Sequence, residues 1–138
     1  MDMREYKDFV ERITSPQSNF LSELIKRCQE LENANTVDGS PELNVSLFLT
    51  SAVGMGSECG EFQEIVKKIL FQGKPFTSDT VFHLKRELGD IMWYWVNACR
   101  SLGLDPEEVV QENITKLEAR YTGSFSVERS ENRKAGDL

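Results

Sequence analysis

The sequence predicts an all-α domain, a helical bundle with two long antiparallel core helices. Apolar residues recur at helical spacing in most segments, and no long run alternates between apolar and polar residues as a strand would. Proline and glycine also fall at the expected helix boundaries. A chain of 138 residues has the length of one domain. We expect that domain over residues 1–122, including a helical arm over 1–40, followed by a polar tail over 123–138.

Two helices are expected in the N-terminal arm. The first covers residues 2–13 and ends before Pro16, because proline disfavours helix in the residue that precedes it. The second runs over about residues 19–32. The apolar side of the first helix is formed by Tyr6, Phe9, Val10 and Ile13.

The main body begins after the segment NANTVDGSPE, whose composition is typical of a turn. One helical pattern then extends over residues 41–72, with Gly73 just past its end. Within it, Gly54, Gly56 and Gly60 each cost ~1 kcal/mol relative to alanine. These glycines indicate close helix packing or a local bend.

A second long pattern covers residues 79–102, and either Thr77 or Ser78 can cap it. A last helix is expected over residues 106–121, with Asp105 as its cap and a proline in its first turn. The tail has no helical stripe. We therefore expect it to be disordered or ordered only against another surface.

Charge and composition exclude several classes of protein. The 23 acidic and 16 basic residues give a formal charge of −7, which argues against binding to nucleic acid or to an anionic membrane. We expect a cytoplasmic protein, since the N-terminal segment lacks the apolar run of a signal or a membrane span. The three cysteines form no CxxC pair, so a disulfide framework or a zinc site is not expected.

Four carboxylates lie within strongly apolar stretches of the two long helices. Glu58 and Glu61 share one helix face, and Glu87 and Asp90 share another. The short connection predicts that the two helices pack antiparallel. Because Glu61 and Glu87 each lie 13 residues from Lys74, the two acidic pairs should meet at one level of the bundle.

Converging carboxylates would repel one another unless a cation lies among them. Oxygen ligands select Mg²⁺, with Mn²⁺ as a substitute, over Zn²⁺ or copper. The alternative is that both pairs lie on solvated helix faces, where acidic residues are most often found.

Two stretches, LTSAVGMGSECGEF and ELGDIMWYWVNACRSLGLDPEEVVQENITKLEARY, resemble the MazG-like branch of the all-α nucleoside triphosphate pyrophosphohydrolases over about residues 41–125. The family signature is ExxE, a spacer, then ExxD. The resemblance implies metal-dependent hydrolysis of a nucleoside triphosphate between the α and β phosphates, yielding the monophosphate and pyrophosphate. Glu58, Glu61, Glu87 and Asp90 match the family's metal ligands. The resemblance also implies that the protein assembles as a homodimer or homotetramer.

Other residues are candidates for substrate contacts. Tyr94 shares the face of Glu87 and Asp90, so it could meet a base or a phosphate, or be a core aromatic. Asn113, Lys116 and Arg120 form a polar stripe that composition alone would leave solvated. The resemblance implies that Lys116 and Arg120 contact phosphate. It also places Lys68 where some members carry a tryptophan that contacts the base.

We expect Glu61 or Glu58 to position the attacking water, and deoxynucleotides such as dGTP or dCTP to be preferred. A di-iron bundle needs Glu-x-x-His pairs, which His83, the single histidine, does not form. A helical interaction module without enzymatic activity is the alternative.

Trp93 and Trp95 are expected to pack. The two long helices nevertheless carry more apolar area than a single small bundle covers, which favours a symmetric assembly. The large residues concerned are Phe48, Phe62, Phe71, Met92, Trp93 and Trp95.

Overall fold

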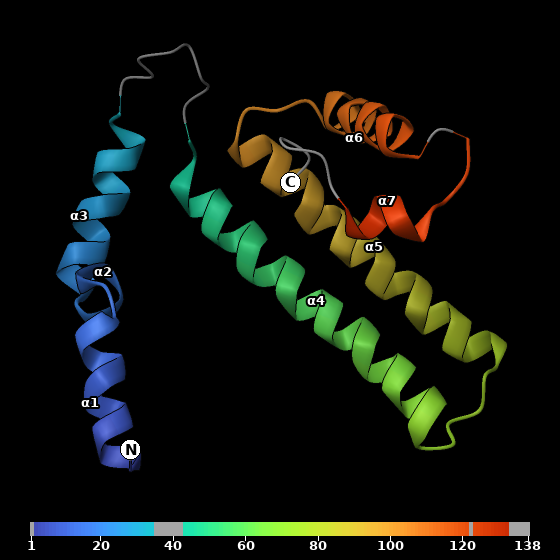
Figure 1. The fold of residues 1–138 in the computed structure, drawn as a ribbon, viewed down its shortest axis with the longest axis horizontal. Coiled ribbons are helices and arrows are strands. Elements are labelled where there is room, and N and C mark those ends of the chain that lie inside the picture. The colour runs from blue at the N-terminus through green and yellow to red at the C-terminus, as the bar shows by residue number, and fades with distance from the viewer. Residues whose placement is uncertain (1, 35–42, 122, 133–138) are drawn as a thin grey trace.

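The computed structural model describes residues 2–34, 43–121 and 123–132. Within these ranges the chain is helical and contains no strand, which confirms the predicted fold class (Figure 1). The helices are α1 (Met3–Ile13), α2 (Pro16–Asn19), α3 (Leu21–Glu32), α4 (Val45–Phe71), α5 (Ser78–Ser101), α6 (Pro106–Arg120) and α7 (Val127–Glu131).

The centre of the fold is a hairpin of the two longest helices, α4 and α5, which run antiparallel side by side (Figure 1). Its buried residues are mostly small or polar: Ser51 and Gly54 on α4, and Asn97 and Ser101 on α5. The open end is tied by a hydrogen bond in which the Asn44 amide donates to the Ser101 carbonyl oxygen at 2.9 Å. Small residues allow the two helix backbones to approach closely.

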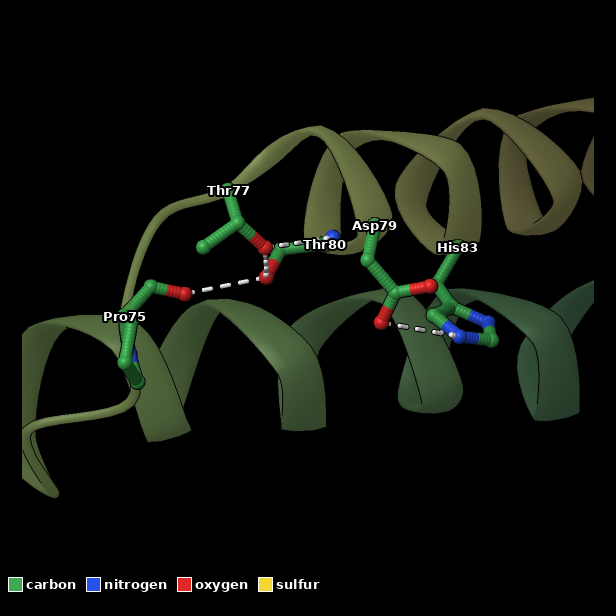
Figure 2. A network of polar contacts seen from close by, with 5 residues as sticks. All are labelled: Pro75, Thr77, Asp79, Thr80 and His83. Atoms are coloured by element: carbon green, nitrogen blue, oxygen red, sulfur yellow. Dashed lines mark hydrogen bonds and ion pairs between the residues drawn. The ribbon is translucent and has the colours of Figure 1, made fainter.

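The connection between α4 and α5 is built by local hydrogen bonds. Gly73 follows the last turn of α4 with a positive φ of 69°, a conformation that favours glycine. Thr77 then caps α5, as expected, by accepting a hydrogen bond from the Thr80 amide at 3.3 Å. The buried Thr80 hydroxyl donates to the Pro75 carbonyl oxygen at 2.9 Å (Figure 2). These contacts fix the closed end of the hairpin.

Helix α6 lies on the other side of α5 from α4 (Figure 1). Asp105 accepts a hydrogen bond from the Glu107 amide and caps α6, and Pro106 occupies its first position, both as expected. The tail differs from the expectation. Ser126 accepts a hydrogen bond from the Arg129 amide and starts the short helix α7. This helix was not predicted, because the tail has no apolar stripe at helical spacing.

Two boundaries also differ from those expected. The second arm helix, α3, begins at Leu21, slightly later than expected, because Phe20 is extended, with φ −129° and ψ 119°. The separate short helix α2, which begins at Pro16, was not expected. Helix α4 begins later than expected, at Val45, because Asn44 is its cap and accepts a hydrogen bond from the Leu47 amide at 2.9 Å. The expected start at Pro41 lies outside the described residues.

Much apolar surface remains uncovered in the single chain. Helix α1 buries none of its residues, and it diverges from α4 together with α3 (Figure 1). Phe48 and Phe71 are 41% and 81% exposed, and Met92 and Trp93 are 63% and 57% exposed, whereas Phe62 and Trp95 are half-buried. Trp93, which was expected to pack, is therefore more than half exposed in the single chain. No described helix combines the length and apolarity needed to cross a membrane.

Candidate metal centre

Three of the four predicted carboxylates meet between the long helices. Glu58 and Glu61 on α4 and Glu87 on α5 each offer an oxygen, and these oxygens all lie within 4.8 Å of one another. Glu58 and Glu87 are half-buried, whereas Glu61 is exposed. The helical spacing of Glu58 and Glu61 brings them to one face, and the antiparallel hairpin brings Glu87 to the same level.

Asp90 falls outside that group of three. It is exposed, although its charge is close enough to act on Glu58. The register predicted from Lys74 is therefore correct for Glu61 and Glu87, and Asp90 lies at the margin of the site.

The electrostatics of Glu58 and Glu64 differ sharply. Partial burial raises the pKa of Glu58, and the negative charges of Glu61, Asp90 and Glu87 raise it further. One turn beyond Glu61, hydrogen bonds from Lys67 and Lys68 lower the pKa of Glu64. The charges acting on Glu58 thus all oppose its ionisation, and a bound cation would remove that opposition.

The donor set fits a hard divalent cation. Carboxylate oxygens are the ligands that Mg²⁺, Mn²⁺ and Ca²⁺ prefer, and the group of three contains only carboxylates. One oxygen from each residue leaves further coordination positions for water or substrate oxygens. The arrangement can therefore hold a cation and a phosphate group together.

Tyr94 lies next to this site and packs against α4 at Gly54. A Cβ atom at Gly54 would overlap Cε1, Cζ and Cδ1 of the Tyr94 ring, so only glycine fits there. The Tyr94 and Trp93 rings meet edge to face, with their centroids 4.8 Å apart. The sequence indicated close helix packing or a local bend at its helical glycines. Close packing within the chain is present at Gly54, whereas a Cβ at Gly56 or Gly60 would meet nothing within 4 Å.

The other predicted contacts lie on other parts of the molecule. Asn113 and Lys116 line a cavity of about 530 Å³ beside Trp95, on the α6 side of α5. None of the three clustered glutamates lines that cavity. Arg120, at the end of α6, stacks its guanidinium 5.8 Å from the Tyr121 ring centroid.

Lys68 and His83 lie toward the closed end of the hairpin. The Lys68 ammonium is 3.4 Å from a carboxylate oxygen of Glu64. His83, one turn before Glu87, places Nε2 3.7 Å from an oxygen of Asp79 (Figure 2). Each basic side chain therefore pairs with an acidic residue of its own helix.

Comparison with known proteins gives one family match and one relative of this chain. Residues 49–125, more than half of the chain, match the family model described as MazG nucleotide pyrophosphohydrolase domain. The gene 37 protein of Mycobacterium phage L5 is 36% identical over 69 residues, which are 49% of this chain and 60% of that protein. The chain thus spans less than two thirds of this relative. No solved structure gives a significant match.

Proposed function

We propose that this chain, which belongs to the MazG nucleotide pyrophosphohydrolase family, hydrolyses a nucleoside triphosphate between its α and β phosphates. The products are the nucleoside monophosphate and pyrophosphate. The observation that carries this proposal is the group of Glu58, Glu61 and Glu87, whose oxygens lie within 4.8 Å of one another across two helices. These three residues, with Asp90 at the margin, are the proposed ligands of Mg²⁺ or Mn²⁺.

The reaction requires a water molecule placed in line with the bond that breaks. Glu61 or Glu58 orients this water and accepts a proton from it. The water oxygen bonds to the α-phosphorus, while the bond from that phosphorus to the oxygen bridging to the β-phosphorus breaks and its electron pair leaves with pyrophosphate. A bound divalent cation supplies positive charge that offsets the charge of the phosphates.

The substrate class follows from the family, and the base preference is a further proposal. We propose deoxynucleotides, dGTP or dCTP, as preferred substrates. Mixing the purified protein with each triphosphate and Mg²⁺ and measuring pyrophosphate tests the reaction directly. Pyrophosphate and monophosphate in equal amounts are expected. Release of inorganic phosphate alone would contradict cleavage at this bond, and no product from any triphosphate would favour the interaction module.

Lys116 and Arg120 are proposed to contact the triphosphate, with Asn113, Lys68 and Tyr94 as further candidates. Lys116→Ala and Arg120→Ala should each raise the KM for the triphosphate about tenfold, because a hydrogen bond to a charged group contributes about 1.5–3 kcal/mol. The affinity for Mn²⁺ without nucleotide should stay unchanged. Steady-state kinetics measures the KM for the triphosphate, and Mn²⁺ titration without nucleotide measures the affinity for the metal.

Lys26→Ala, which removes an exposed lysine of α3, is the matched control and should leave KM unchanged. A wild-type KM in both the Lys116 and Arg120 variants would mean that the polar stripe of α6 is solvated.

We also propose that the protein works as a homodimer or homotetramer. Its accessible surface is 11127 Å², whereas a compact monomer of 15.8 kDa exposes about 7,300 Å². Obligate interfaces bury about 2,000–5,000 Å² in total, which is about 1,000–2,500 Å² per chain, so a second copy can account for part of the excess. We further propose that the tail takes part in the assembly through Arg129 and Arg133, of which Arg133 lies outside the described residues.

Light scattering at micromolar concentration should give at least twice the mass of one chain. Val53→Glu should lower that mass, because this side chain is 73% exposed in one chain and the change adds charge to the apolar surface of α4. Gln63→Glu adds the same charge at an exposed polar position of α4 and should leave the mass unchanged. A fully active monomer would refute the assembly.

A further inference from the structure

The contact between Tyr94 and Gly54 lies one helical turn from the carboxylates on both helices. Gly54 precedes Glu58 by four residues, and Tyr94 follows Asp90 by four. The two residues are also equally far from the centre of the hairpin, each 20 residues from Lys74. The ring therefore lies between α4 and α5 at the level directly beside the proposed site.

At this level the ring occupies the space that a methyl group on α4 would need. Its neighbours toward the open end of the hairpin, Ser51 and Asn97, are 0% and 4% exposed, so the helices cannot move closer there without displacing buried groups. At the closed end, Thr80 is 2% exposed and bonded to Pro75. The carboxylates thus lie between the contact of Tyr94 with Gly54 and the closed end of the hairpin, where Thr80 is buried.

From this arrangement we infer that Tyr94 is a positioning residue, whose ring on Gly54 sets the spacing between α4 and α5 and thereby the size of cation that the carboxylates accept. The inference rests on the proposed function. Mg²⁺ and Mn²⁺ need shorter distances to oxygen, about 2.0–2.2 Å, than Ca²⁺, which binds at about 2.3–2.6 Å. Helices held closer together therefore favour the smaller ions over Ca²⁺.

The test is a pair of substitutions that change the volume at one contact. Gly54→Ala adds a methyl group that overlaps the Tyr94 ring. To relieve this overlap the ring must move away from α4, which should increase the distance between α4 and α5. Mn²⁺ affinity, measured by electron paramagnetic resonance without nucleotide, should fall about 10-fold to 100-fold. Ca²⁺ affinity, measured by displacement of Mn²⁺, should fall less, so the ratio of the two affinities should decrease.

Restoring the volume should restore the ion preference. Leucine lacks atoms at the positions of Cε1 and Cζ, so the double variant Gly54→Ala with Tyr94→Leu should recover most of the Mn²⁺ affinity and of the Mn²⁺ to Ca²⁺ ratio. Tyr94→Phe keeps the ring and should bind both ions as the wild type does. If the Tyr94 hydroxyl also meets substrate, Tyr94→Phe and the double variant, which both lack it, will show a raised KM, while the Mn²⁺ to Ca²⁺ ratio of Tyr94→Phe stays at the wild-type value.

Gly56→Ala is the matched control for placing alanine in α4, because a Cβ atom there meets nothing within 4 Å. It should keep the wild-type affinities, and circular dichroism should show that all variants remain helical. An unchanged Mn²⁺ to Ca²⁺ ratio in Gly54→Ala, or a double variant no better than that single variant, would overturn the inference while leaving the proposed function intact. Wild-type protein that binds no Mn²⁺ would overturn both.

Discussion

Glu61→Gln is expected to reduce pyrophosphate release at least about 10³-fold, the range in which a positioned acid or base contributes to a reaction. The amide is nearly isosteric with the carboxylate, so no cavity forms, while the group loses the charge and the basicity that the proposed reaction needs. Turnover at saturating Mg²⁺ and triphosphate measures the loss. In metal-free buffer the melting temperature should stay equal or rise, because the repulsion that acts on Glu58 decreases.

Glu64→Gln is the matched control on the same helix. Its carboxylate is paired with Lys67 and Lys68 and is not part of the group of three, so turnover should stay near that of the wild type. Wild-type turnover in Glu61→Gln would contradict the assigned site. Equal losses in both variants would instead indicate a general sensitivity of α4 to loss of charge.

Removal of divalent cations is expected to abolish turnover and to lower thermal stability. A ligand at 100 times its dissociation constant stabilises the folded state by about 2.7 kcal/mol when it does not bind the unfolded chain. Mg²⁺ added back to chelated protein should therefore restore pyrophosphate release and raise the melting temperature by several degrees. Calorimetry before and after the addition measures the second effect.

The stabilisation should depend on the carboxylates and not on ionic strength. NaCl at matched ionic strength should give a much smaller shift, and the Glu61→Gln variant should respond weakly to Mg²⁺. Full turnover in the presence of excess chelator would contradict a metal-dependent site. A shift of equal size with NaCl would attribute the stabilisation to screening of the net charge of −7.

The sequence predicted the long helices and their register because both depend on regular patterns. Helical periodicity, a short connection and the equal distances from Lys74 were sufficient to bring Glu61 opposite Glu87. The boundaries that differ depend on single side chains. Asn44 starts α4 by accepting one hydrogen bond, and Phe20 interrupts the arm by being extended. Several polar residues near Asn44 could equally have capped α4, so the sequence does not identify the first residue of the helix.

The glycines of α4 show a difference in packing that the sequence pattern does not predict. Gly54, Gly56 and Gly60 look alike in sequence, but only Gly54 faces the ring of Tyr94. What distinguishes Gly54 is the residue opposite it on α5. That residue can be identified from the sequence only once the register of the two helices is known. Asp90 shows the same limit, because the helical spacing with Glu87 gives a shared face but does not bring the Asp90 carboxylate into the group formed by Glu58, Glu61 and Glu87.

The short connection between α4 and α5 has a consequence for the order in which the protein folds. All four candidate ligands lie on one hairpin, so the site requires only contacts within that hairpin, and contacts at shorter sequence separation generally form before those between more distant parts of a chain. The apolar side of α1, none of which is buried in the single chain, can instead be covered only by a surface distant along the chain or by another subunit. We therefore expect the ion to bind before assembly is complete. Stopped-flow refolding should then show an early phase that Mg²⁺ accelerates at any protein concentration, and a later phase that depends on concentration.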